Sequence, residues 1–166
     1  MPGRIGSRGI MPGLAGAVFV AGLAFGQEGL ASPWRRHTID NSYVGADGAR
    51  AQIGALGARP EFAVVWEQTG LTTLLAWPEP ELAGCAWPFE IVGATPAAED
   101  AIAVDLDGDG DRDVVVCMEG TERRVSFFEN KIESFHEHRL SLDPFKWMIA
   151  EPTDLDGDGR VDLVVG

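Results

Sequence analysis

Two acidic stretches, each followed by a run of apolar residues, constrain the fold of this chain more than any other feature. The first is DLDGDGDRDVVV at residues 105–116, and the second is DLDGDGRVDLVVG at residues 154–166. In the first stretch an aspartate stands at every second position from Asp105 to Asp113. Carboxylates this close repel one another unless a counter-charge lies among them. The pattern therefore predicts a cation-holding loop that leads into a β-strand.

Glycines show how the backbone can bring these carboxylates together. Gly108 and Gly110, like Gly157 and Gly159, permit tight turns with positive φ. A loop curled in this way turns the first, third, fifth and ninth side chains inward, together with the carbonyl of the seventh residue. Such an all-oxygen cage suits Ca²⁺, which takes about six to eight oxygen ligands. The predicted side-chain ligands are Asp105, Asp107, Asp109 and Asp113 in the first loop and Asp154, Asp156, Asp158 and Asp162 in the second, and the predicted carbonyl ligands belong to Asp111 and Arg160.

The residues that follow the loops exclude an EF-hand, which starts in the same way. An EF-hand needs a glutamate at its twelfth position and helices on both sides. That position is Val116 or Val165 here, inside a run that favours a strand. We therefore expect a calcium loop between two strands. The alternative, a solvated acidic turn without an ion, leaves the clustered charges unexplained.

The acidic loops belong to a longer repeat with a period near 50 residues. Their first aspartates, Asp105 and Asp154, are 49 positions apart (154 − 105). The segment at 53–68 aligns with 105–120 without gaps, and Glu61 falls on the last aspartate. Its other acidic positions are apolar or glycine, so we interpret it as a repeat that keeps the strand and lacks the ion.

Each repeat contains about four short strands separated by turns, a pattern typical of propeller blades. We expect an all-β fold of four-stranded antiparallel blades, forming an incomplete propeller of about three repeats because a full ring needs about four to eight. The boundaries are a degenerate blade at about 40–93, a calcium blade at 94–142 and the start of a truncated calcium blade at 143–166. The expected strands are 49–56, 61–67, 71–77 and 88–93 in the first repeat, 101–106, 113–119, 123–130 and 136–142 in the second, and 147–155 before the second acidic loop.

The two acidic motifs resemble the FG-GAP/VCBS-type repeats of integrin-like β-propellers. The resemblance covers roughly residues 40–166 and implies calcium loops, ligated by the aspartates named above, between the first two strands of each blade. The FG and GAP elements themselves are not recognisable, and the first repeat lacks ligands. An integrin-type adhesive role is therefore not implied, and fold alone does not decide between binding modules and enzymes.

Composition and the N-terminal segment limit the partners and the location. Hydrophobic residues make up 45% of the 166-residue chain, and the net charge of −13 disfavours nucleic acid and anionic membranes as partners. Arg4 and Arg8 precede an apolar run at 14–26 that ends in small residues before Gln27, the layout of a signal peptide over residues 1–26. A retained membrane anchor is the alternative. We expect a secreted, periplasmic or cell-surface protein that binds a protein or glycan, with no oligomer predicted and no membrane span after signal removal.

Other candidate residues carry weaker signals. Cys85 and Cys117 could pair in an oxidising compartment, although a free buried cysteine is an equal alternative. His136 and His138 could share a strand face and bind a transition metal, but no third ligand is evident, which favours solvated histidines. The five tryptophans are expected to pack between strands rather than stack on sugars. No catalytic motif is present, and the competing function is the first blades of a secreted propeller enzyme, a hydrolase or a dehydrogenase.

Overall fold

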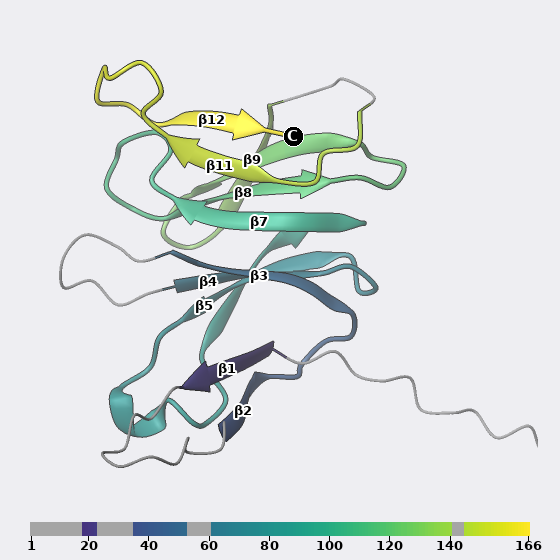
Figure 1. The fold of residues 1–166 in the computed structure, drawn as a ribbon, viewed down its shortest axis with the longest axis vertical. Coiled ribbons are helices and arrows are strands. Elements are labelled where there is room, and N and C mark those ends of the chain that lie inside the picture. The colour runs from purple at the N-terminus through teal and green to yellow at the C-terminus, as the bar shows by residue number, and fades with distance from the viewer. Residues whose placement is uncertain (1–17, 23–34, 53–60, 141–144) are drawn as a thin grey trace, which may run out of the picture.

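The protein is an all-β structure built from successive antiparallel sheets (Figure 1). The computed structural model describes residues 18–22, 35–52, 61–140 and 145–166. The first sheet has the order β3-β4-β5-β6, the second runs in the same sense from β7 to β10, and two further pairs are β1-β2 and β11-β12. The elements are β1 Val18–Gly22, β2 Arg35–Asp40, β3 Ala46–Gln52, β4 Glu61–Trp66, β5 Leu71–Ala76, the 3₁₀ turn η1 Pro80–Leu82, β6 Phe89–Ala94, β7 Ala98–Val104, β8 Asp113–Met118, β9 Arg124–Asn130, β10 Phe135–Arg139, β11 Ala150–Thr153 and β12 Asp162–Val165.

The fold class expected from the sequence is confirmed. Each predicted strand overlaps an observed one, and the two complete sheets are four-stranded antiparallel units consistent with propeller blades. The predicted strand at 49–56 begins earlier, in β3, and its residues 53–56 lie outside the described residues. The predicted strand at 147–155 shortens to β11 because the second acidic loop begins directly after it. The sheets do not close into a ring within the described residues.

β8 explains why valine-rich runs form the centre of each sheet. All residues of β8 are buried. Because alternate side chains of a strand point to opposite faces, Val114 and Val116 pack with Val65 of the first sheet. Val115 and Cys117 face the other way and pack with Ala150 of β11. A strand that is covered on both faces has no polar side, so its sequence is an unbroken apolar run.

The first strands of the three repeats lie in succession across the molecule (Figure 1). β3 packs against β7, and β7 packs against β11. A charged link joins all three strands. Nη1 of Arg50 lies 2.8 Å from Oδ2 of Asp100, and the same oxygen accepts a hydrogen bond of 3.0 Å from the Ala150 amide. Arg50 also donates to the Ala150 carbonyl and forms an ion pair with Glu151. This link therefore fixes the three sheets relative to one another.

Aromatic residues fill the other face of the first sheet, as expected. Trp66 and Trp87 are buried beneath Ile39 of β2, and Trp77 packs against this cluster. Trp147 packs on the second sheet near Ala150, while Trp34 lies outside the described residues. The two cysteines do not pair. Cys85 is exposed and Cys117 is buried, both as free thiols.

Most of the predicted signal peptide lies outside the described residues, namely 1–17 and 23–26. Val18–Gly22, within the same segment, pairs with β2 as strand β1. In the part of the chain that is described, no helix has the length and apolar character needed to cross a membrane.

Candidate metal centre

The first acidic loop connects β7 to β8 and gathers three carboxylates. One ligand oxygen from each of Asp105, Asp107 and Asp113 lies within 4.8 Å of the others. Asp113 is fully buried at the start of β8, whereas Asp107 is exposed at the loop tip. Neighbouring strands thus fix one side of the group, and the other side is open to solvent. A cation could enter from that open side.

Hydrogen bonds from backbone amides hold the loop in its curled form. The amides of Gly108 and Gly110 donate to the two oxygens of Asp105, at 2.8 and 3.2 Å, and the Asp109 amide donates to Asp107 at 3.1 Å. Both glycines have positive φ, +81° and +97°. A Cβ atom would meet nothing within 4 Å at either position. Glycine is therefore required for the backbone conformation and not for lack of space.

Asp113 ties the loop to the sheet. Its Oδ2 accepts a hydrogen bond of 2.9 Å from the Leu106 amide, and its Oδ1 accepts one of 2.9 Å from the Asn130 amide at the end of β9. The two carboxylate oxygens together have about four acceptor sites, so these bonds leave capacity to bind a cation. Burial raises the pKa of Asp113 above its ordinary value, although hydrogen bonds from backbone amides, those of Asn130 and Leu106 above all, act in the opposite direction. A bound cation would offset the cost of burying this charge.

The second loop, between β11 and β12, repeats this geometry. Its triad is Asp154, Asp156 and Asp162, again with ligand oxygens within 4.8 Å. The glycine amides at 157 and 159 donate to Asp154 at 2.8 and 3.0 Å, and the Leu155 amide donates to Asp162 at 2.9 Å. The ion pairs of Arg50, Arg112 and Lys131 are all made with carboxylates outside the two triads. Two loops of the same design therefore each bring three carboxylates close together, and the charge of Lys131 acts on the first of them from nearby.

The remaining predicted ligands lie outside these triads. Asp109 and Asp158 each accept a hydrogen bond from the amide two residues later, at 3.1 and 2.8 Å. Those amides belong to Asp111 and Arg160, whose carbonyl roles stay predictions. The ion-free loop inferred at 53–60 lies outside the described residues. Glu61, aligned with the last aspartate, forms an ion pair of 3.0 Å with Arg112. This pair joins the first acidic loop to the first sheet.

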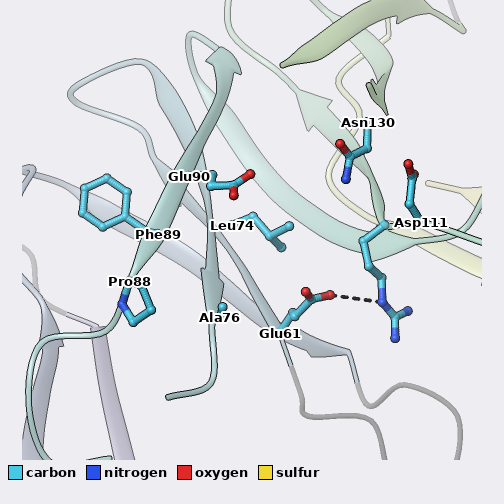
Figure 2. A pocket seen from close by; sticks show the side chains of 9 residues that line it. Glu61, Leu74, Ala76, Pro88, Phe89, Glu90, Asp111 and Asn130 are labelled. Atoms are coloured by element: carbon cyan, nitrogen blue, oxygen red, sulfur yellow. Dashed lines mark ion pairs between the residues drawn. The ribbon is translucent and has the colours of Figure 1, made fainter. Parts of the chain in front are cut away.

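A cleft of about 430 Å³ lies beside that ion pair, between the first sheet and the first acidic loop (Figure 2). Glu61, Glu90 and Asp111 supply its acidic groups, and burial raises the pKa of Glu61 and of Asp111. The described lining contains no serine, cysteine, histidine or lysine. The cleft therefore offers carboxylates and one arginine, without a nucleophile and base pair. Its lining residues are Glu61, Leu74, Ala76, Pro88, Phe89, Glu90, Asp111, Arg112 and Asn130.

A different ligand group lies on the β9-β10 hairpin at one edge of the second sheet. Glu129 of β9 joins His136 and His138 of β10, with one ligand atom from each within 4.8 Å of the others. The sequence interpretation found no third ligand for the two histidines and was wrong on this point. Glu129 is seven residues from His136 in the chain but directly opposite it in the strand pair. If the segment at 131–134 had been read as the turn of a β-hairpin, the sequence would have predicted that Glu129 lies opposite His136.

These observations define an all-β repeat protein with four-stranded antiparallel sheets and acidic loops that could hold metal ions. Residues 105–165 match the model of one family, described as FG-GAP-like repeat, so this part of the chain is an FG-GAP-like repeat region. The matched region begins at the first aspartate of one acidic loop and ends just after the other. No curated protein and no solved structure matches the chain.

Proposed function

We propose that this protein is an exported, propeller-type repeat protein whose two acidic loops bind Ca²⁺. The observation that carries the proposal is the recurrence of one geometry. Two loops, 49 residues apart, use amide donors at the same positions to gather three carboxylates. The five amide hydrogen bonds inside the first loop all recur inside the second. A cation common to both loops explains the shared design.

The donor set selects the class of cation. Every candidate ligand atom in the loops is an oxygen, which suits a hard cation and disfavours zinc or copper. Mg²⁺ demands near-ideal octahedral geometry, whereas Ca²⁺ accepts the irregular, carboxylate-rich cages that such loops form. The triads would hold the ions. The side chain of Asp109 or Asp158 and the carbonyl of Asp111 or Arg160 would complete the ligand shell in the first or second loop. The ion would neutralise the mutual repulsion of the carboxylates and stabilise the folded strands on either side.

Export and an interaction role complete the proposal. The N-terminal segment supports secretion, and weak extracellular calcium sites are filled at about 0.1 to 1 mM. The strongly acidic chain would repel nucleic acid and anionic membranes, which leaves a protein or a glycan at the cell surface or in the periplasm as the partner class. The calcium would act structurally, holding the blades that present the binding surface.

A calcium titration of the full chain by calorimetry tests the metal assignment. The test variant is the double substitution Asp107→Asn, Asp156→Asn. Asparagine retains the oxygen that accepts the amide of residue 109 or 158, so the loop stays curled while one ligand charge is lost from each triad. The matched control is Glu81→Gln, Glu133→Gln, which removes two exposed acidic charges outside the loops.

The wild type and the control should bind two calcium ions, and the loop variant should bind them at least about tenfold more weakly. Ions that bind only the folded state also raise the melting temperature. At a free concentration about ten times Kd, each site adds about 1.4 kcal/mol to the free energy of unfolding. Equal calcium binding by loop variant and control, or a melting curve unchanged by chelator, would refute the assignment.

A further inference from the structure

The second sheet carries a candidate site of different chemistry on the hairpin formed by β9 and β10. His136 and His138 alternate on β10 and therefore point to the same face. In the antiparallel pairing of β9 with β10, His136 stands opposite Glu129 and His138 stands opposite Phe127. Glu129 and Phe127 alternate in the same way on β9. The hairpin thus places two imidazoles, a carboxylate and an aromatic ring on one face.

The three polar side chains converge on a small volume. Nδ1 of His136 lies 3.1 Å from Nε2 of His138, which in turn lies 2.8 Å from Oε2 of Glu129. Two ligand atoms at about 2.0–2.1 Å from a tetrahedral metal are about 3.3 Å apart. These two separations are slightly shorter, and the ligand atoms of His136 and Glu129 lie within 4.8 Å of each other, so small shifts of the side chains would admit an ion.

Hydrogen bonds alone cannot satisfy all three ligand atoms, His136 Nδ1, His138 Nε2 and Glu129 Oε2. A neutral His138 Nε2 carries either one hydrogen or one lone pair, never both. It faces two neighbours, His136 Nδ1 and Glu129 Oε2, and a single hydrogen can be aligned with only one of them. A divalent cation at the centre would accept a lone pair from all three atoms. The arrangement is therefore better matched to a cation than to its own hydrogen bonds.

Neighbouring side chains hold two of the ligands in place. The His138 ring stacks on Phe127, with ring centroids 5.4 Å apart and an angle of 23° between the planes. Lys131 forms an ion pair with Oε1 of Glu129, which leaves Oε2 directed at His138. Glu129 has only 16% of its side chain exposed. Both rotamers are thus restricted before any ion binds, which lowers the ordering cost of ligation.

We propose that Glu129, His136 and His138 form a binding site for a transition-metal dication such as Zn²⁺. Two imidazoles and a carboxylate suit zinc, copper or nickel, whereas Ca²⁺ prefers oxygen ligands alone. Three protein ligands leave a fourth position for water or for a donor from a partner. The site is independent of the acidic loops, so either assignment can fail without the other.

Zinc titration by calorimetry, on the full chain in excess calcium, tests this site without interference from the acidic loops. The test variants are His136→Gln and the pair His136→Gln, His138→Gln. His37→Gln is the matched control. The chain has three histidines, and His37 is the one outside the group, on β2. Melting curves in chelator establish that each variant is folded.

The wild type and His37→Gln should bind one Zn²⁺, His136→Gln should bind it about tenfold more weakly or worse, and the pair should lose it. In the wild type, zinc should shift the ring-proton NMR signals of two histidines and leave the third unchanged, a readout that needs no variant. The proposal would be overturned if the double variant bound zinc with wild-type affinity, or if zinc shifted only the ring-proton NMR signals of His37.

Discussion

Arg50 offers the sharpest test of how the sheets are joined. Its guanidinium reaches from β3 to Asp100 on β7 and to Ala150 and Glu151 on β11. Substituting Arg50→Met retains an apolar stem of similar shape and removes every one of these contacts. The substitution therefore separates the charged link from side-chain packing. We expect a folded protein of reduced stability.

The expected loss of stability depends on the groups that lose their partner, above all the carboxylate of Asp100. The Asp100 side chain is 11% exposed and would keep one donor, the Ala150 amide at 3.0 Å. Breaking a fully buried ion pair costs about 3–5 kcal/mol. Because the Arg50 side chain is 26% exposed, water replaces part of the interaction, and we expect about 2–3 kcal/mol. The Glu151 side chain is 60% exposed and adds little. For a chain of this size the loss corresponds to roughly 4–12 °C in melting temperature.

Urea unfolding followed by tryptophan fluorescence measures this loss. Arg139→Met is the matched control, since Arg139 is exposed and lies 4.0 Å from its only acidic neighbour in the described structure. That control should change the free energy of unfolding by less than about 0.5 kcal/mol. Adding Asp100→Asn to Arg50→Met should recover part of the loss, because no buried charge is then left unpaired. A loss for Arg50→Met no larger than that of the control would refute the reasoning.

Two further predictions concern groups whose pKa is raised. Burial, and then the charge of Asp100, raises the pKa of the Cys117 thiol to about 12. An alkylating reagent should therefore label only the exposed Cys85 in native protein and both cysteines in denatured protein. Equal labelling of the two thiols in native protein would contradict the burial of Cys117. Burial, and then the charges of Glu119 and Asp47, raises the pKa of Glu99 to about 7, so the folded state holds this proton more tightly than the unfolded state does. Stability should therefore fall as the pH rises from about 4.5 through 7. The substitution Glu99→Gln should raise the urea midpoint of unfolding near pH 8 but not near pH 4.5. An equal change of the midpoint at the two pH values would argue against the titration of Glu99 in this range.

The strands and acidic loops could be predicted because their signals are local. The run Asp113–Met118 is apolar beyond its first residue, and each aspartate motif is complete within 13 residues or fewer of sequence. The glycine positions set the loop conformation without help from distant residues. The repeat then extended one strand assignment to the next. Local pattern and repetition were sufficient for the fold class and for locating the acidic loops, whereas the sequence did not single out the three carboxylates that group in each loop.

Contacts between distant residues could not be predicted in the same way. Arg50 meets Asp100 across 50 residues and Ala150 across 100 residues. No motif marks these positions, and their meeting depends on how neighbouring sheets stack. Glu129 was missed for a related reason, because strand register brings it opposite His136. A register error of one residue would place Glu129 on the other face of the sheet.

The architecture itself explains where chemistry can occur in this protein. Both faces of the second sheet are covered over β8, by the first sheet on one side and β11 on the other. The candidate ligand groups of the described residues are therefore found at strand ends, in the acidic loops, and on the β9-β10 hairpin at the edge of the second sheet. The acidic loops occupy the first kind of position and the Glu129 group occupies the second. Substitutions at either place should change ligand binding while leaving the buried core intact, whereas substitutions in the apolar part of β8, after the ligand Asp113, should unfold the sheet before they affect any site.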